Sequence, residues 1–467
     1  MLIRNAEIVD LPSGRVRSAD LRLAHGRIRQ IGSLVPQPGE ILIDAGGGAL
    51  LPGLHDHHIH LMSFAASLDS VRCGPPEVAS ADALSSVLCS AATRTGWLRG
   101  IGYHESVAGD IDSRWLDARI ADHPVRIQHR SGRLWILNSA ALAALRDTDS
   151  APVLPGDGRI YDQDLLLGEL FGRTLPPMTP ASRRLASYGV TAVTDMTPSN
   201  DEQAFTRFTD LHSSGHLLQS VHLAGSMDLP YPSNRHGVVT GATKIHLHDS
   251  SLPVFEDLCE LIRASHANDR PVAVHCVTEV ALVFALAALR ETGLHQRDRI
   301  EHASVTPPSL VDQLYESGLL VVTQTNFVAE RGDEYLEDLP KQEHPWLYRA
   351  GTFLARGVRL AGGTDAPFGE ADPWIAMHAA VTRTTRTGAV LGAAERLTPE
   401  QAMALFAGSC EVPEIPLRLE EGAVADLCLL SEPWGRARRL LSSDLVSATL
   451  RRGELIFDRT GASLRDP

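Results

Sequence analysis

Hydrophobic residues recur along the chain in two patterns, and each pattern predicts a different kind of element. Short runs that alternate apolar and polar residues fill the first 50 positions and return after about Pro413, which is typical of a small sheet. Between them, continuous apolar runs alternate with segments of helical period, which favours parallel strands covered on both faces. The two β-rich ends most simply pair into one small domain.

Eight apolar runs in the middle of the chain are candidate parallel strands, with helical segments between them. Eight βα units make a TIM barrel, so we predict an α/β fold: a TIM (β/α)8 barrel with a small β-sandwich-like domain formed by both chain termini. The expected strands are 48–54, 190–194, 221–224, 243–247, 272–276, 299–301, 319–323 and 358–361, and two of the expected helices are 254–267 and 280–292.

The first two barrel strands are separated by far more chain than one crossover needs. The gap from His60 to Val190 contains strand and helix patterns of its own, at 124–127 and 138–145. We therefore expect an α/β insertion after barrel strand 1, lying over the barrel mouth. The predicted domains are a small β domain from 1–50 and 413–467, and a barrel from 51–412 with an inserted subdomain at about 62–185.

Composition narrows the function classes. The chain is 43% hydrophobic and 21% charged, as a soluble protein with a large core is, and its net charge of −14 argues against nucleic-acid binding. Six cysteines without a C-x-x-C pair indicate reduced thiols, and the N-terminus lacks the apolar segment of a signal peptide. We expect a cytoplasmic protein with a small-molecule substrate and neither nucleic acid nor membrane as partner; a homodimer is left open.

Histidines and one aspartate stand at the ends of the predicted barrel strands, where TIM-barrel chemistry takes place. His58 and His60 are two positions apart on the first strand, so their side chains share one face. Strands five, six and eight end at His275, His302 and Asp365. Each residue alone has an ordinary explanation, such as a hydrogen-bonded core histidine or, for Asp365, a helix N-cap. Their coincidence at one rim favours a metal site.

Lys244 begins the fourth predicted strand, and it is one of only two lysines among 43 basic residues. A protonated ammonium would be repelled by metal ions. A lysine that has reacted with carbon dioxide is instead an anionic carbamate, a carboxylate-like bridging ligand, and arginine cannot form one. The alternative is a structural lysine paired with an acid.

The motifs together resemble the amidohydrolase superfamily of metal-dependent hydrolases, and specifically amidohydrolase family 3, the branch that includes N-substituted formamide deformylases. The resemblance covers nearly the whole chain. It rests on P-G-x-x-D-x-H-x-H at 52–60, G-V-T-A-V-T-D at 189–195, A-T-K-I around Lys244, R-I-E-H-A ending at Ala303, G-T-D-A-P at 363–367 and the weaker L-T-P-E-Q-A at 397–402.

This resemblance implies a binuclear metal centre. His58 and His60 would hold the more buried ion, His275 and His302 the more exposed one, a carboxylated Lys244 would bridge them and Asp365 would complete the first site. Zinc is the expected metal, with manganese or iron as alternatives. A metal-bridging hydroxide would attack a non-peptide C–N bond, an amide or formamide, while Asp365 takes its proton and delivers it to the leaving group.

The chain also departs from the family pattern, which bears on substrate contacts. The insertion has Ser-Gly-Arg at 131–133 where Asp-Gly-His is usual, so Arg133 and the following Trp135 are candidate contacts. His248 stands where aspartate is frequent, and it is either a substrate contact or a hydrogen-bonded structural residue. The alternatives to amide hydrolysis are a cyclic-amide hydrolase or deaminase on the same scaffold, or a non-catalytic scaffold, which would be expected to lack ligands.

Overall fold

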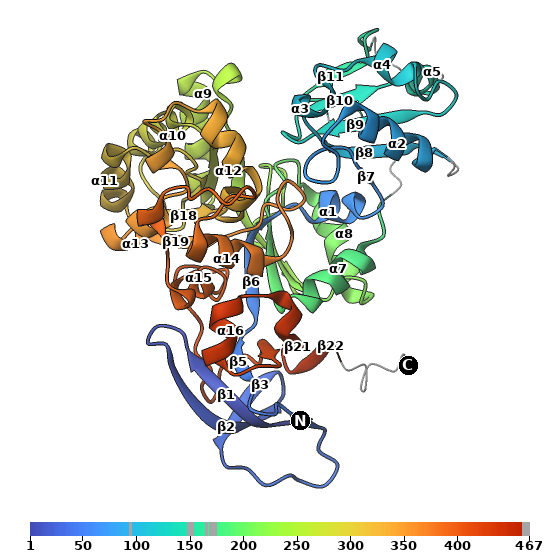
Figure 1. The fold of residues 1–467 in the computed structure, drawn as a ribbon. Coiled ribbons are helices and arrows are strands. Elements are labelled where there is room, and N and C mark those ends of the chain that lie inside the picture. Colours follow the sequence, from blue (N-terminus) through green and yellow to red (C-terminus); the bar gives the residue numbers. More distant parts are fainter. Residues whose placement is uncertain (93–95, 147–153, 164–166, 168–174, 460–467) are drawn as a thin grey trace. The chain divides into compact units, whose positions relative to one another are not determined.

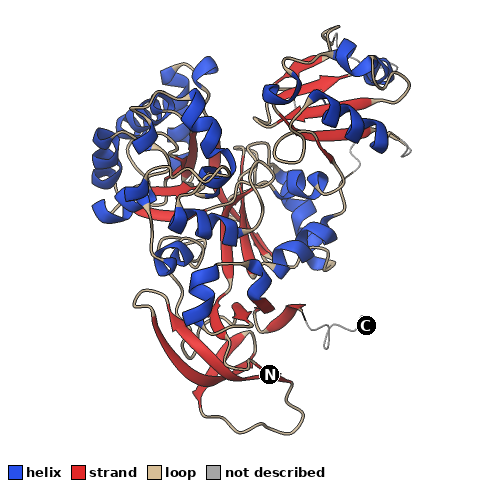
Figure 2. Ribbon diagram, viewed as in Figure 1, coloured by secondary structure: helices blue, strands red, loops and turns tan. Residues whose placement is uncertain are grey.

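The computed structural model describes residues 1–92, 96–146, 154–163, 167 and 175–459. The chain divides into two compact units. The larger unit contains Met1–His60 and Met178–Pro467, and the smaller unit is Leu61–Pro177. Figures 1 and 2 show the helices and strands of each. Among the described helices, none has the length and apolar character needed to span a bilayer.

The larger unit is built around a nearly closed barrel of eight parallel strands (Figure 1). This architecture confirms the α/β barrel predicted from the alternating apolar runs. In order around the barrel the strands are β6 (Leu54–Ile59), β12 (Val190–Asp195), β13 (Ser220–Gly225), β15 (Val238–His246), β16 (Val272–Cys276), β17 (Arg299–His302), β18 (Leu320–Thr323) and β19 (Arg359–Gly362), with the short β14 (Asn234–Arg235) paired to β15.

Helices follow the barrel strands, and several begin at side chains that cap them. Asp201 and Thr278 accept hydrogen bonds from the first turns of α8 and α10, and Thr398 forms a capping box with Gln401 at α15. The helices of this unit are α7 (Met178–Ser187), α8 (Glu202–Ser213), α9 (Phe255–Ala267), α10 (Glu279–Thr292), α11 (Pro308–Ser317), α12 (Asn326–Asp338), α13 (Ala350–Arg356), α14 (Pro373–Thr382), α15 (Pro399–Ala404) and α16 (Trp434–Leu440).

The predicted first strand, 48–54, is wrong in its bounds because the chain changes sheets at Gly53. The Gly53 N–H donates to Asp426 O in the terminal sheet, and the next N–H, of Leu54, donates to Gly189 O in the barrel. A Cβ atom at Gly53 would lie 2.4 Å from the Thr191 hydroxyl, so only glycine fits at this crossing. The run therefore forms two strands, β5 in the terminal sheet and β6 in the barrel.

The start of the fourth strand is also corrected. Lys244 is the seventh residue of β15, not its first, and lies near the carboxyl end. Thr240 and Gly241 interrupt the apolar pattern and hid the first half of the strand, although both are buried. The correction places Lys244 at the same end of the barrel as the other candidate ligands.

Strands from both ends of the chain form one eight-stranded sheet in the larger unit. β5 joins the two ends, because it pairs in parallel with β1 and antiparallel with β20. Side chains from both ends of the sheet, such as Ile28 and Ala448, belong to one buried cluster. The strands are β1 (Leu2–Asp10), β2 (Arg15–Ala24), β3 (Arg27–Gly32), β4 (Leu42–Asp44), β5 (Ala49–Pro52), β20 (Leu427–Leu430), β21 (Val446–Arg451) and β22 (Glu454–Asp458).

The smaller unit contains a five-stranded sheet of its own. The strands are β7 (Val71–Arg72), β8 (Leu98–Tyr103), β9 (Val125–His129), β10 (Leu134–Leu137) and β11 (Arg159–Tyr161), and helices include α1 (Leu61–Ser67), α2 (Ala81–Ala91), α3 (Glu105–Ala108), α4 (Ser113–Asp117) and α5 (Ser139–Arg146). The segments predicted at 124–127 and 138–145 correspond to β9 and α5. Leu84, Leu88, Val125 and Ile127 lie in its buried cluster.

Candidate metal centre

Three of the candidate ligands meet where β6 and β19 end. Asp365 Oδ1 lies 3.5 Å from His58 Nε2 and 3.3 Å from His60 Nε2. His58 and Asp365 are buried and His60 is half-buried. Burial alone would raise the pKa of Asp365, but its close approach to His60 and to the other nearby histidines holds that pKa far below its ordinary value. The carboxylate is therefore anionic and available to a cation.

The helix-cap explanation for Asp365 does not hold. The next helix, α14, begins at Pro373, and its N-cap is Asp372, whose side chain accepts a hydrogen bond from Trp374 N–H. Asp365 instead has a left-handed backbone, with φ at 57°, and its N–H donates to His58 O at 2.7 Å. Residues other than glycine rarely adopt this conformation, and those that do are concentrated at functional sites.

Each of three histidines has its Nδ1 held by a polar partner, which leaves its Nε2 for a ligand. An acceptor at Nδ1 fixes the tautomer in which Nε2 carries a lone pair, and this is how proteins orient metal-binding imidazoles. The partners are Glu301 Oε2 for His58 (2.6 Å), Gln324 Oε1 for His302 (2.7 Å) and, as a hydroxyl that can accept, Thr197 Oγ1 for His60 (3.1 Å). His302 Nε2 is buried and has no hydrogen-bond partner among the described residues.

Sequence reasoning missed these partners. Glu301 directly precedes His302 in the R-I-E-H motif, and that position was the available signal. Burial alone would raise the pKa of Glu301, but Arg299, His58 and Lys244 hold it well below its ordinary value. Gln324 and Thr197 carry no local pattern that marks them, because only the barrel brings them to the histidines.

Lys244 is buried near Glu301, Arg299 and Asp365. Its Nζ has no hydrogen-bond partner, and it forms no ion pair, within the residues that the structure describes. Burial lowers the pKa of Lys244 to about 8, although Glu301 opposes this effect. The structure therefore gives no support to a lysine paired with an acid. A buried amine without a partner fits a position where a further group is bound.

Asp56, in the same motif as His58 and His60, ties the two barrel strands together. Its carboxylate accepts hydrogen bonds from the backbone N–H of Thr364 at 2.9 Å and of His58 at 3.1 Å. Burial raises the pKa of Asp56 to about 7. Its position is structural: it links β6 to the end of β19 and leaves ligation to its neighbours.

His275, at the end of β16, brings a second group of imidazoles to the same end of the barrel. Its ring centroid lies 4.4 Å from that of His302 and 4.1 Å from that of His246. His248 lies just beyond β15, with its ring 4.1 Å from His246. The structure thus places His248 beside candidate ligands, and it adds His246, which sequence reasoning did not single out as a site residue.

The two candidates from the insertion lie in the smaller unit. Arg133 Nε donates to Asp162 Oδ1 at 2.7 Å, and Trp135 is buried in that unit's own core. The guanidinium carbons of Arg99 and Arg126 each lie 5.5 Å from the Trp135 ring centre. These contacts account for both side chains structurally, and their role toward a substrate stays a prediction.

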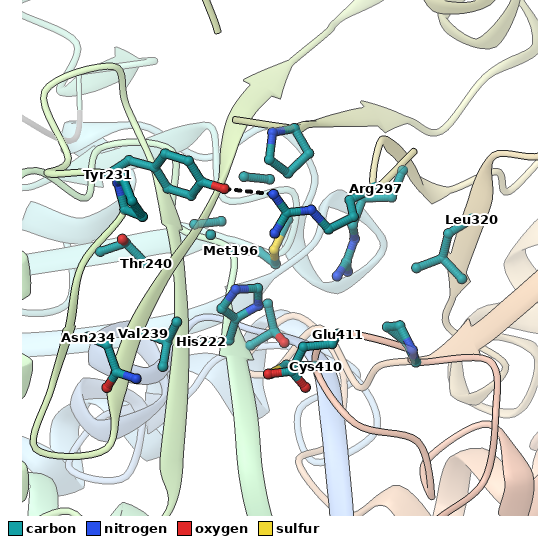
Figure 3. A pocket seen from close by; sticks show the side chains of 18 of the residues that line it. Met196, His222, Tyr231, Asn234, Val239, Thr240, Arg297, Leu320, Cys410 and Glu411 are labelled. Atoms are coloured by element: carbon teal, nitrogen blue, oxygen red, sulfur yellow. Dashed lines mark hydrogen bonds between the residues drawn. The ribbon is translucent and has the colours of Figure 1, made fainter. Parts of the chain in front are cut away.

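A separate cavity of about 320 Å³ opens near the amino-terminal starts of β15 to β19 (Figure 3). Its lining includes His222, Glu411 and Tyr231, whose hydroxyl accepts a hydrogen bond from Arg297 Nη2 at 2.9 Å. None of the candidate ligands lines it. The candidate metal centre stands at the carboxyl ends of the strands, as TIM-barrel chemistry requires.

The donor set fits metal ions by its chemistry. Imidazole nitrogens with lone pairs, an ionised carboxylate and an amine that no described residue contacts by a hydrogen bond are buried or half-buried at one end of the barrel. Such groups are costly to bury unless a cation or hydrogen-bond partner satisfies them. His58, His60 and Asp365 have donor atoms within 4.8 Å of one another, close enough to share one ion.

Several known proteins have similar sequences or folds. An N-substituted formamide deformylase of Arthrobacter pascens is 24% identical over 99% of this chain and 99% of its own. An adenine deaminase of Nitratidesulfovibrio vulgaris is 26% identical over 74% of this chain and 60% of its own. The crystal structure of an uncharacterized metal-dependent hydrolase from Pyrococcus horikoshii has the same fold, with a TM-score of 0.75 and 21% identity over 92% of this chain and 97% of that one.

The family model described as "Amidohydrolase family" matches residues 42–457, which include the barrel and every candidate ligand. This membership indicates metal-dependent hydrolysis of C–N bonds. With its barrel, its strand-end histidines and this match over most of its length, the chain belongs to the amidohydrolase family.

Proposed function

We propose that this protein hydrolyses the C–N bond of a non-peptide amide or formamide in a small-molecule substrate, using two divalent ions, with zinc as the expected metal. The observation that carries the proposal is the set of donor atoms. Asp365 Oδ1 lies within 3.5 Å of the Nε2 atoms of His58 and His60. Lys244 Nζ and His302 Nε2 are buried and have no hydrogen-bond partner among the described residues. The formamide preference rests on similarity to the deformylase.

The residues divide into ligands and one proton carrier. His58, His60 and Asp365 would hold one ion, and His275 and His302 the other. When bound, the ions lower the pKa of a water molecule toward neutrality and polarise the scissile carbonyl. Asp365 is ionised and its Oδ1 faces both histidines of β6, so it can accept the proton from the attacking water. It then delivers this proton to the leaving nitrogen.

We propose further that Lys244 carries a carbamate. The ammonium first loses one proton, and the neutral amine then adds to carbon dioxide with loss of a second proton. The two steps together replace a cation by an anion in the middle of the donor set. The lowered pKa of Lys244, about 8, gives a usable fraction of neutral amine near neutral pH. We predict that Lys244→Arg folds normally and loses activity, and that ¹³C-bicarbonate gives a carbamate signal in the native protein only. An active, metal-loaded crystal with an unmodified lysine would refute the carbamate.

The test of function is a substrate panel for the metal-loaded protein. It contains N-substituted formamides, N-acyl amines, cyclic amides, adenine and dipeptides, with Asp365→Asn as the matched blank. Turnover of formamides or N-acyl amines above the blank is the expected result. Turnover of dipeptides alone would contradict the non-peptide assignment, and turnover of none of them would contradict the proposal.

A cyclic-amide hydrolase or a deaminase is the second candidate. It is favoured by the similarity to adenine deaminase and by a match to the dihydroorotase of Ruminiclostridium cellulolyticum, which is 38% identical over 61 residues, 13% of this chain and 14% of its own. The same donor set serves either reaction, because the metal ligands do not report the substrate. Preferential turnover of adenine or cyclic amides in the panel would establish this candidate instead.

A further inference from the structure

Three histidines form a second group of nitrogen donors next to Asp365, His58 and His60. His246 and His275 lie side by side on adjacent strands, because β15 and β16 pair them directly in register. His248 follows two residues after His246. Each of the three offers a nitrogen within 4.8 Å of the others. We propose that His246, His248 and His275 form a divalent metal site that holds its ion through imidazoles alone, without the Lys244 carbamate.

The hydrogen bonding of these rings differs from that of the other candidate ligands. Within the described part of the chain, neither His246 nor His275 makes a hydrogen bond through its ring, whereas His58, His60 and His302 each use Nδ1. The ring nitrogens of His246 and His275 are therefore not engaged by a described residue and are available as ligands. A metal ion supplies a partner to one nitrogen of each ring.

The arrangement selects the class of metal. Imidazole donors suit zinc, nickel and copper, while magnesium and calcium prefer oxygen ligands. His246 is exposed and His248 is only partly buried, so the ion has an open side for a water molecule or substrate atom as a further ligand. The pairing of β15 with β16 fixes the backbones of His246 and His275. Only their side chains need to move for the three rings to bind one ion.

The proposal rests on the metal dependence proposed above and changes the ligands of the second ion: His275 stays a ligand, and His246 and His248 take the place of His302. His302 lies between the two groups, with its ring 4.8 Å from His58 and 4.4 Å from His275. If the second ion depended on the carbamate, it would be lost with Lys244. If the imidazoles of His246, His248 and His275 hold the second ion, this ion stays bound when Lys244 is replaced.

The experiment counts zinc by elemental analysis after equilibrium dialysis. Wild type is expected to bind about two equivalents and the His246→Gln/His248→Gln variant about one, since only one donor of the three-histidine set remains. The matched control is His266→Gln/His295→Gln, which replaces two histidines that contact Asp298 and Asp269 outside the donor set and is expected to bind as wild type does. Cobalt-substituted protein provides a second readout, because loss of one of two nitrogen-ligated ions lowers the visible absorption.

A second pair of variants tests independence from the carbamate. Lys244→Arg is expected to keep the zinc held by the three histidines, and adding His246→Gln/His248→Gln to it is expected to remove that zinc. The inference is overturned if His246→Gln/His248→Gln binds zinc as wild type does, or if Lys244→Arg alone abolishes all binding. Zinc content needs no turnover, so these results are independent of whether the substrate panel identifies a C–N substrate.

Discussion

Asp365 combines two properties at the residue scale that a proton carrier needs: it is ionised, and it is fixed. Its carboxylate faces the Nε2 atoms of His58 and His60, and its backbone is held in the left-handed region by a hydrogen bond to His58. An amide at this position keeps the size and one oxygen ligand but cannot carry the proton. The side chain's role in proton transfer can therefore be separated from its role in metal binding.

We predict that Asp365→Asn keeps most of its metal while kcat falls by roughly 10²- to 10⁴-fold, the usual contribution of a positioned acid–base group. Both kcat and kcat/KM should fall together, because the interaction is made in the transition state. Steady-state kinetics and elemental analysis of the same sample check this. Near-normal turnover in the variant would contradict the proton-carrier role.

Glu301 acts on the metal through His58. It is buried, accepts the His58 Nδ1 hydrogen bond and is paired with Arg299. We predict that Glu301→Gln weakens zinc binding by roughly 10- to 100-fold, the usual cost of losing a partner that orients a ligand. Competition with a chelator measures this affinity.

The control for Glu301→Gln is the same substitution at Glu395, another buried acid that pairs with an arginine. In the part of the chain that the structure describes, Glu395 has none of the candidate ligands as a hydrogen-bond partner. Glu395 accepts hydrogen bonds from Thr352 N–H at 2.7 Å and from Arg349 Nε at 3.4 Å. Glu395→Gln is expected to lower the melting temperature and leave zinc affinity unchanged, since no ligand depends on it. Equal losses of affinity in both variants would mean that Glu301 acts through stability alone.

At the scale of elements, the barrel is closed between β19 and β6 by side chains and loops, with no continuous ladder between the two strands. Asp56 accepts the Thr364 N–H, and Asp365 N–H reaches His58 O across the same junction. The backbones approach closely at Gly363, where a Cβ atom would lie 2.5 Å from His58 Cβ and 2.7 Å from His58 N. The position of His58 on β6 therefore depends on the close packing of the segment that follows β19.

We predict that Gly363→Ala lowers both the melting temperature and zinc affinity, because the added methyl group must displace His58 or its strand. Gly435→Ala is the matched control: a Cβ at this position in α16 would meet nothing within 4 Å, and alanine favours a helix by up to about 1 kcal/mol. Thermal unfolding with and without zinc compares the two. A Gly363→Ala protein that binds zinc as wild type does would show that the junction tolerates the methyl group.

Most of the elements followed from sequence periodicity, and the errors have physical causes. The run Val272–Cys276 was predicted to the residue because it opens with three consecutive buried apolar residues, 272–274. The chain's change of sheet at Gly53 was missed because periodicity does not report pairing partners. Lys244 was placed at the start of its strand because a threonine and a glycine interrupted the apolar pattern before it.

The histidine and aspartate ligands could be named from the sequence because each lies at a strand end, a position that a motif and a barrel topology define. Lys244 was named because lysine is rare in this chain and can form a carbamate. The hydrogen-bond partners of the histidines could not be named. Gln324 and Thr197 belong to other strands' loops, and only folding brings them to His302 and His60. His246 was not predicted as a ligand because only the register between β15 and β16 brings it beside His275, and the sequence does not show that register. The predicted domain boundaries and the substrate role of the insertion stay predictions.

At the scale of the whole molecule, we expect metal binding to be coupled to the folding of the larger unit. The ligands proposed above for the two ions lie in the larger unit, and the smaller unit has a sheet and a buried cluster of its own. A ligand stabilises the unit that binds it, by about 2.7 kcal/mol at a free concentration one hundred times its Kd. The two units should therefore respond differently to zinc.

We predict that zinc raises the unfolding temperature of the larger unit and leaves that of the smaller unit, Leu61–Pro177, unchanged. Calorimetry with zinc or with a chelator should show two transitions, one of which moves. Hydrogen exchange read by mass spectrometry assigns them, because peptides from the barrel gain protection with zinc and peptides from the smaller unit do not. His60→Asn is the control, since loss of a ligand should reduce the shift. A single transition that moves as a whole, with protection gained equally across both units, would show instead that the units unfold together and that the smaller one senses the metal.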